Sequence, residues 1–234
     1  MTPDQSGTCA KARRNSLRHA FASCHVVLSL LIIAGASANA AESSPDTTGS
    51  KIGSRAWGFS VSANNYLLPF DPDILVLVGT ADRDHLHLEA RYNYEGVKVG
   101  SGFVGWNFSG GQTVEFTAIP MAGVAFGRTN GLIPALKLSV GYGIADVYAE
   151  IEYLYDLDDS EGNFFYSWWE LGFTPVDMIR AGAVAQRTRI VRTPLDVDRG
   201  IFAQFVREPV SVSLYAFNLF TNSWFLVAGV AVAL

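Results

Sequence analysis

Ten residues carry the strongest structural signal in this chain: His85-Leu86-His87-Leu88-Glu89-Ala90-Arg91-Tyr92-Asn93-Tyr94. The odd positions are all ionic or polar, and the even positions are all apolar or aromatic. Successive side chains of a strand point to opposite faces, so this pattern predicts a strand with one polar and one apolar face. In a soluble sandwich the polar face meets water. In a membrane barrel the apolar face meets lipid and the polar face lines the lumen.

The first 40 residues have the three parts of a secretory signal peptide. A basic segment at 11–18 precedes an apolar run at 26–35, and Ala38-Asn39-Ala40 is a small-x-small cleavage site. The apolar run is too short to be a membrane-spanning helix, which needs roughly 20 residues. We therefore predict export through a signal peptide at 1–40, with cleavage after Ala40.

The positions of the cysteines and of the basic residues exclude several functions for the mature chain. Both cysteines, Cys9 and Cys24, lie in the leader, so disulfides, thiol catalysis and thiolate metal sites are excluded. Most of the basic excess leaves with the leader, and no basic patch of the kind that nucleic-acid binding needs remains. We expect no nucleic-acid partner and no cofactor. Residues 41–56 are predicted to be a flexible periplasmic lead-in, and 57–234 to be one domain.

The domain shows short alternating runs separated by turn residues, which predicts an all-β fold. We divide it into twelve strands, with ten as the second choice, and the least secure division falls at 139–143. The expected strands are 57–66, 74–81, 85–94, 97–108, 112–127, 132–141, 145–155, 164–174, 178–191, 200–207, 211–219 and 223–234.

Loop lengths favour a barrel over a sandwich. The three longest expected connections, 67–73, 157–163 and 192–199, are the first, seventh and ninth, all odd. If both chain ends face the periplasm, odd connections face outward, and outer-membrane barrels have long outer loops and short periplasmic turns. We therefore predict a closed antiparallel up-and-down transmembrane β-barrel at 57–234.

The chain also resembles Gram-negative outer-membrane β-barrel proteins, and in particular uncharacterised proteobacterial envelope barrels. The resemblance covers roughly 57–234 and rests on the leader, the all-β body, the lack of cysteine in the mature chain and a closing apolar strand. Tyr and Trp near the expected strand ends, among them Tyr66 and Tyr94, suit two aromatic girdles at the membrane interfaces. The resemblance implies an outer-membrane location among lipids and lipopolysaccharide. It also implies that the barrel-assembly machinery binds the last strand. Leu234 departs from the family, which prefers an aromatic residue at the end.

Charged and polar side chains on the expected inward faces form the candidate site, because a base facing lipid at mid-depth costs about 2–4 kcal/mol. The candidate lumen or constriction residues are Glu89, Arg91, Glu115, Glu150, Glu152, Glu170, Arg180, Gln186, Arg187 and Arg189. We expect Glu150 and Glu152 to meet the bases at the end of the ninth strand and to form the narrowest, ion-selective zone. Gln186 and Arg187 cannot both face inward on a regular strand.

The function predicted from these residues is a passive small-solute channel or a structural envelope protein with a charged lumen. An outer-membrane lipid-modifying hydrolase and a periplasmic lipocalin-like binding barrel remain alternatives. His85 and His87 share one face of the expected strand, yet no cysteine or compact carboxylate cluster in the sequence completes a metal site. They also fall at the periplasmic end, away from outer-leaflet lipid. We therefore assign no catalytic and no metal-ligating residue.

Overall fold

The computed structural model describes residues 56–190 and 196–234, so the expected signal peptide and the lead-in up to residue 55 lie outside the described residues. These ranges hold thirteen strands and one short 3-10 helix, η1 (Ser160–Gly162). No helix among them is long and apolar enough to cross a membrane. The strands are β1 (Gly58–Leu67), β2 (Ile74–Arg83), β3 (Leu86–Tyr92), β4 (Val99–Trp106), β5 (Phe108–Gly110), β6 (Glu115–Gly127), β7 (Gly131–Tyr142), β8 (Ala145–Asp156), β9 (Phe164–Val176), β10 (Ile179–Ile190), β11 (Asp196–Arg207), β12 (Val210–Phe217) and β13 (Phe225–Ala233).

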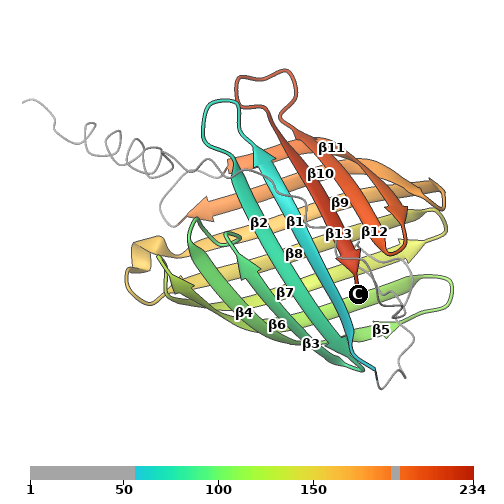
Figure 1. The fold of residues 1–234 in the computed structure, drawn as a ribbon, viewed down its shortest axis with the longest axis horizontal. Coiled ribbons are helices and arrows are strands. Elements are labelled where there is room, and N and C mark those ends of the chain that lie inside the picture. Colours follow the sequence, from blue (N-terminus) through green and yellow to red (C-terminus); the bar gives the residue numbers. More distant parts are fainter. Residues whose placement is uncertain (1–55, 191–195) are drawn as a thin grey trace, which may run out of the picture.

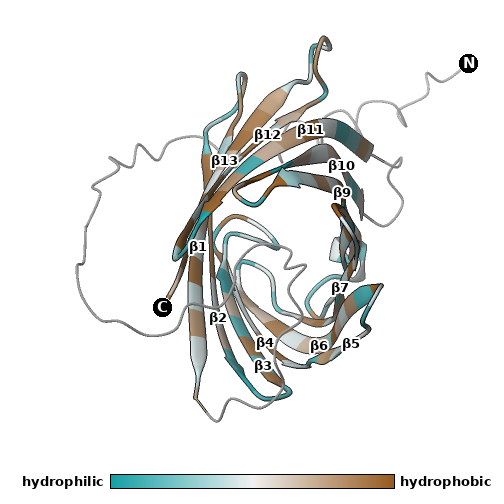
Figure 2. Cartoon of the chain, turned by 90° about the vertical axis from the view of Figure 1, so that its right-hand side faces the viewer, coloured by the Kyte–Doolittle hydropathy of each residue, from teal (hydrophilic) through white to brown (hydrophobic). Residues whose placement is uncertain are grey.

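The strands form one antiparallel sheet that closes on itself (Figures 1 and 2). Each strand except β4 pairs with the next along the chain, and β1 pairs with β13. The ring is completed by β4, which pairs with β3 on one side and with β6 on the other. Since β5 continues β4 along β6, the two share one position, and the ring has twelve. The predicted closed barrel of twelve strands is confirmed.

The connections differ in length between the two ends of the barrel. At the end that we name the turn end, the β2–β3, β7–β8, β9–β10 and β11–β12 connections have two residues each, and the β5–β6 connection has four. At the loop end, the β1–β2, β3–β4, β8–β9 and β12–β13 connections have six or seven residues, and the β6–β7 connection has three. The prediction that long connections gather at one end is confirmed. The long connection expected at 192–199 is shorter, because β11 begins at Asp196.

The division that the sequence left least secure is confirmed by a tight turn. β7 ends at Tyr142 and β8 begins at Ala145, with Gly143 and Ile144 between them. Gly143 has a φ of 59°, in the left-handed region that glycine enters without a steric penalty. The glycine therefore lets one long apolar run fold back as two paired strands.

The outer surface of the barrel is apolar. On β6, Phe116, Val124 and Phe126 are exposed and point outward, while Met121 and Ala125 between them are buried inside. The same alternation appears in the hydropathy bands along the strands in Figure 2. A continuous apolar surface of this extent is not stable in water, so the barrel requires lipid around it. A soluble lipocalin-like barrel is not favoured.

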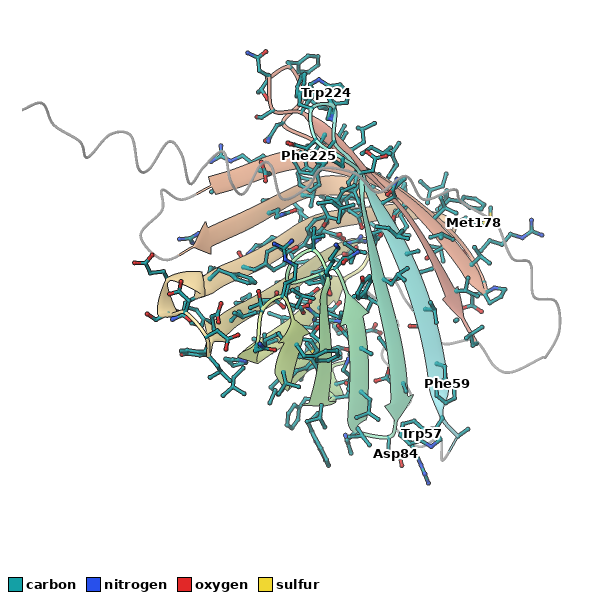
Figure 3. All side chains as sticks on the ribbon, turned by 60° about the vertical axis from the view of Figure 1, so that its left-hand side comes forward. Trp57, Phe59, Asp84, Met178, Trp224 and Phe225 are labelled. Atoms are coloured by element: carbon teal, nitrogen blue, oxygen red, sulfur yellow. The ribbon has the colours of Figure 1, made fainter. Side chains whose placement is uncertain are left out.

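Aromatic side chains mark both ends of this apolar surface. Figure 3 shows Trp57 and Phe59 near the β2–β3 turn at Asp84, with Trp224 at the opposite, loop end. All three aromatic side chains are exposed to at least 38%. Amphipathic aromatic rings prefer the boundary between hydrocarbon and headgroups. The ring positions therefore fit two membrane interfaces.

Two clusters of buried apolar side chains fill much of the interior near the loop end. The first contains Tyr166, Trp168, Val184, Phe202, Tyr215, Phe217 and Val227. The second contains Val99, Phe103, Met121, Ala125, Ile133 and Leu154. Gly123 makes room for Phe103, since a Cβ at that position would lie 2.3 Å from the phenyl ring. The more open space lies toward the turn end.

Candidate functional site

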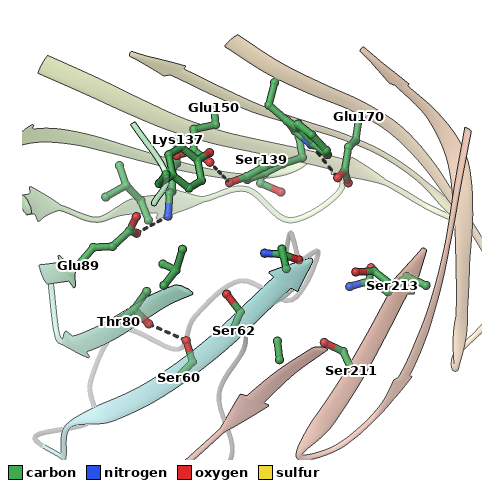
Figure 4. Close-up of a pocket in the computed structure, with 18 of the residues that line it drawn as sticks. Ser60, Ser62, Thr80, Glu89, Lys137, Ser139, Glu150, Glu170, Ser211 and Ser213 are labelled. Atoms are coloured by element: carbon green, nitrogen blue, oxygen red, sulfur yellow. Dashed lines mark hydrogen bonds and ion pairs between the residues drawn. The ribbon is translucent and has the colours of Figure 1, made fainter. Parts of the chain in front are cut away.

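A cavity of about 350 Å³ occupies the lumen toward the turn end, between two unlike walls (Figure 4). One wall, which we name the hydroxyl wall, consists of small uncharged polar side chains on β1, β2 and β12. Its members are Ser60, Ser62, Asn64, Thr80, Ser211 and Ser213. The hydroxyl oxygens of Ser60 and Thr80 are 2.7 Å apart. Gly229 of β13 leaves room for two other members of this wall, because a Cβ there would lie 2.3 Å from Asn64 Oδ1 and 2.4 Å from Ser213 Oγ.

Another part of the lining is ionic and contains Glu89, Lys137 and Glu150. The base at the centre of this ionic network is Arg91 of β3, whose side chain is completely buried. Its Nε donates to Glu89. Its Nη2 donates to Glu150 Oε1 at 2.6 Å, and its Nη1 donates to Glu152 Oε2 at 2.8 Å. Glu150 and Glu152 lie on β8, and β4, β6 and β7 separate β8 from β3 in the ring. These bonds therefore cross the lumen rather than joining neighbouring strands.

Lys137 of β7 adds a second base by pairing with Glu89 (Figure 4). Glu95, from the β3–β4 connection, adds a fourth carboxylate 3.5 Å from Arg91 Nη1. We name these six residues the Arg91 cluster: Arg91, Lys137, Glu89, Glu95, Glu150 and Glu152. Four carboxylates surround two bases, so the cluster holds two more acids than bases.

Glu95 is the least satisfied member of the Arg91 cluster. Its side chain is 0% exposed, and Ser101 Oγ donates to its Oε1 at 2.8 Å. Its Oε2 is buried without a hydrogen-bond partner. Burial raises the pKa of Glu95 above its ordinary value, and this outweighs the opposing effects of Arg91 and Ser101. The β3–β4 connection thus brings an acid into the barrel that favours its neutral form.

A second, smaller group lies on neighbouring strands, and we name it the Arg180 cluster. Arg180 of β10 donates to Asp146 of β8 and, at 2.6 Å, to Glu170 of β9. Glu170 Oε1 also accepts hydrogen bonds from Trp168 Nε1 at 2.9 Å and from the Tyr215 hydroxyl at 3.0 Å. This cluster therefore holds two carboxylates and one base, with its acceptors well occupied.

The cavity is bounded toward the loop end by aromatic side chains, which we name the aromatic ceiling. Its members are Tyr66, Tyr94, Tyr166, Trp168 and Tyr215. Tyr94 comes from the β3–β4 connection, and the Arg91 guanidinium lies 4.2 Å from its ring centroid. The ring of Tyr94 meets the ring of Tyr166 edge-on at 5.8 Å, across the lumen.

The predicted lumen residues fall into four groups. Glu89, Arg91, Glu150 and Glu152 meet in the Arg91 cluster, and Glu170 and Arg180 meet in the Arg180 cluster. Glu115 is exposed at the start of β6, at the turn end, outside both clusters. The remaining three candidates lie on β10.

Of the three β10 candidates, the two with described side chains, Gln186 and Arg187, do not partner Glu150 or Glu152 as expected. Gln186 follows the inward parity of β10 and has a buried side-chain oxygen. Arg187 is exposed on the outer face, with its guanidinium 5.6 Å from the Phe165 ring. Strand alternation makes this separation necessary. The backbone of Arg189 pairs with Phe165, and its side chain lies outside the described residues.

The two histidines do not share a face. His87 is buried, and its ring nitrogens face Asp82 Oδ1 at 2.6 Å and Glu89 Oε2 at 3.1 Å. His85 precedes β3 in the turn and stacks on the outward ring of Trp106 at 5.4 Å. The alternation read from the sequence breaks here, because residue 85 belongs to a turn and not to the strand.

Several lining residues were missed or misplaced by sequence reasoning. Tyr66 and Tyr94 were read as membrane-interface aromatics, yet both line the cavity. Glu95 was read as part of a turn, which carries no facing information. The serines of β1 offered a usable signal, because Ser60 and Ser62 alternate with outward Phe59 and Val61.

The sequence matches no protein-family model and no curated protein. Among solved structures it is similar to the KdgM porin, at 13% identity and a TM-score of 0.52, covering 74% of this chain and 98% of that one. It is also similar to the KdgM porin in complex with disordered oligogalacturonate, at 10% identity and a TM-score of 0.54, with the same coverage. OccK5 (OpdH) of Pseudomonas aeruginosa follows at 11% identity and a TM-score of 0.42, covering 76% of this chain and 67% of that one. The likeness to KdgM shows that this chain has the fold of a porin.

Proposed function

We propose that this protein is an outer-membrane channel for small solutes. The observation that carries the proposal is a cavity of about 350 Å³, partly lined by hydroxyl, amide and charged side chains, inside a closed barrel whose outside is apolar. Side chains fill barrels of eight strands, whereas barrels of sixteen to eighteen strands enclose open aqueous channels. Twelve strands fall between these cases and fit a narrow, selective passage.

The route from the cavity toward the loop end passes the Arg91 cluster. Arg91 lies between the two apolar clusters, since its guanidinium is 4.2 Å from the Tyr94 ring and 4.3 Å from the Phe103 ring. We place the narrowest charged zone there, in agreement with the role first assigned to Glu150 and Glu152. The base that partners both acids is Arg91.

The orientation follows from the connections. Short turns face the periplasm in outer-membrane barrels and longer loops face outward, so the turn end with the C-terminus belongs on the periplasmic side. In this orientation the outward surface contacts lipid and lipopolysaccharide. The closing strand β13, with outward Val230 and Val232, remains our candidate for recognition by the barrel-assembly machinery.

The KdgM porin was solved in complex with disordered oligogalacturonate. We carry over the passage of small solutes and not that ligand. A polyanion entering this lumen meets a surplus of carboxylates in both ionic clusters, which repel it.

The hydrolase hypothesis is not favoured by the geometry. A histidine that activates a serine must have a ring nitrogen within hydrogen-bond reach of the hydroxyl. Both ring nitrogens of His87 face carboxylates, and His85 Nδ1 lies 3.0 Å from the main-chain oxygen of Asn107. A structural envelope protein is the second candidate, because two apolar clusters pack the loop-end half of the interior.

Liposome swelling separates the channel from the structural protein. Protein purified from membranes is reconstituted and challenged with isosmotic glycerol, glucose, sucrose and raffinose. A channel gives swelling rates that fall as solute size rises. Ser62→Phe places a large ring in the cavity and is expected to slow swelling, whereas Ala63→Phe on the same strand faces lipid and is not. Swelling no faster than in protein-free liposomes would overturn the channel and favour the structural protein.

A further inference from the structure

We infer that the solutes of this channel are small organic cations carrying an ammonium group, which bind between Glu150 and the aromatic ceiling. The inference rests on the proposed channel function and adds the chemical class of its solute. Three features of the lumen support it: a surplus of buried acids, an acid that lines the cavity, and the aromatic ceiling, with a wall of hydroxyl and amide groups opposite.

The first feature is the charge of the lumen. The Arg91 cluster has two more acids than bases, and the Arg180 cluster has one more. Charges in a low-dielectric cleft are weakly screened and concentrate ions of the opposite sign. Glu95 favours its neutral form, and without it three carboxylates still face two bases in the Arg91 cluster, so each cluster keeps at least one acid more than its bases. The interior therefore attracts cations and repels anions.

The second feature is where the acids meet the cavity. Glu150 lines it and lies under the aromatic ceiling. Its Oε1 is held by Arg91 at 2.6 Å, while its Oε2 accepts a longer hydrogen bond from the Tyr148 hydroxyl at 3.3 Å. An incoming ammonium group can improve on this longer bond, because hydrogen bonds between charged partners are shorter and stronger. Glu150 is thus the carboxylate best placed to hold a solute.

The third feature is the ceiling itself. Aromatic ring faces attract cations, and ring-lined pockets recognise substituted ammonium groups. The protein already uses this contact, since the Arg91 guanidinium lies over the rings of Tyr94 and Phe103. Such rings bind a potassium ion less favourably than an ammonium group with apolar substituents. The hydroxyl wall carries no base, and Lys137, which also lines the cavity, is paired with Glu89.

The experiment uses planar bilayers and two probes of the same shape. Choline carries a quaternary ammonium group, and 3,3-dimethylbutan-1-ol replaces that group with a neutral carbon. In a potassium chloride gradient the reversal potential is expected to show a preference for potassium over chloride. Choline is expected to block the potassium current at about tenfold lower concentration than the neutral alcohol.

Two variants and one control assign the effect to the site. Glu150→Gln is expected to lower the potassium-to-chloride ratio about twofold and to weaken choline block. Tyr166→Leu keeps every charge, so it is expected to weaken choline block without changing the ion ratio. Glu115→Gln removes an exposed acid outside both clusters and is expected to change neither quantity. Folding of each variant is checked by its heat-dependent shift on a gel, and Tyr166→Leu decides if Glu150→Gln does not fold.

Each outcome is decisive. A current that prefers chloride, or equal block by choline and the neutral alcohol, would overturn the solute class and leave the channel standing. Choline block that is unchanged in both Glu150→Gln and Tyr166→Leu would overturn the site. A bilayer without any current would overturn the proposed channel, and the solute class would fall with it.

Discussion

The Arg91 and Arg180 clusters hold similar side chains but join different parts of the barrel. The Arg180 cluster connects β8, β9 and β10, which are neighbours in the sheet and already paired through their backbones. The Arg91 cluster connects β3 with β7 and β8, and neither of these two strands is a neighbour of β3 in the sheet. One cluster therefore reinforces a wall that hydrogen bonds already define. The other ties two walls together across the lumen and fixes the width of the passage.

The energetic consequences differ as well. Buried charges need partners, and removing one partner of a buried ion pair costs about 3–5 kcal/mol because the remaining charge stays desolvated. Arg91 is shared by four carboxylates, whereas Arg180 is shared by two. Removing the base of the Arg91 cluster is thus expected to lower the stability of the barrel more than removing the base of the Arg180 cluster.

The largest expected effect is that of Arg91→Met, which keeps an apolar stem and removes the charge. It should lower the free energy of unfolding by about 3–5 kcal/mol. Arg180→Met should cost less, because it leaves fewer carboxylates without a base. Denaturant titration of the folded barrel in lipid vesicles measures both. Arg187→Met is the control, since Arg187 is exposed on the outer face. A cost for Arg91→Met no greater than that of Arg187→Met would break the comparison.

A medium effect is expected where packing supports the cross-lumen cluster. Gly123→Ala places a methyl group against Phe103, whose ring lies under the Arg91 guanidinium at 4.3 Å. Overpacking of this kind costs about 1–3 kcal/mol. Gly102→Ala is the matched control, because a Cβ at Gly102 meets nothing within 4 Å. The same titration should show a loss for Gly123→Ala only, and equal values for the two variants would contradict this packing.

The smallest expected effect depends on pH. Burial raises the pKa of Glu95, so its ionisation costs stability once the pH rises above the ordinary pKa of glutamate. Glu95→Gln removes that cost and should be more stable than the unmodified chain at neutral pH. The difference should vanish below pH of about 4.5, where the carboxyl is neutral in both folded and unfolded states. Thermal unfolding across this range measures it.

Glu115→Gln serves as the control for this pH series, because Glu115 is exposed. It should leave the unfolding temperature unchanged at every pH. A Glu95→Gln difference that stays constant with pH, or grows as the pH falls, would show that the buried carboxyl is not the cause.

The comparison also shows what a sequence can predict in a barrel. Alternation assigned Glu89, Arg91, Glu150 and Glu152 to the inward face, and turn residues placed the strand ends within a few positions of the observed ones. Neighbouring strands share depth, so the meeting of Arg180 with Glu170 follows from the order of the strands. These properties are local, so they can be predicted from the sequence of each segment and the order of the strands.

Contacts across the lumen could not be predicted in the same way. Whether Arg91 reaches Glu152 depends on strand tilt, stagger and barrel diameter, which are properties of the closed ring. The expected partners on β10 were chosen by nearness along the sheet, and the actual partner comes from the far wall. Tyr94 and Glu95 lie in a connection, where alternation stops, so no pattern showed that they fold inward.

The most direct test of the central claim is thiol modification of the conducting lumen. The sequence has no cysteine after Cys24, so Ser62→Cys on the hydroxyl wall and Ala63→Cys on the lipid-facing side each introduce a unique reactive thiol into the barrel. Single-channel current in planar bilayers is recorded while a cationic methanethiosulfonate reagent is added. Conduction through this lumen predicts stepwise current loss in Ser62→Cys and none in Ala63→Cys. Absence of current, or equal loss in both variants, would contradict it.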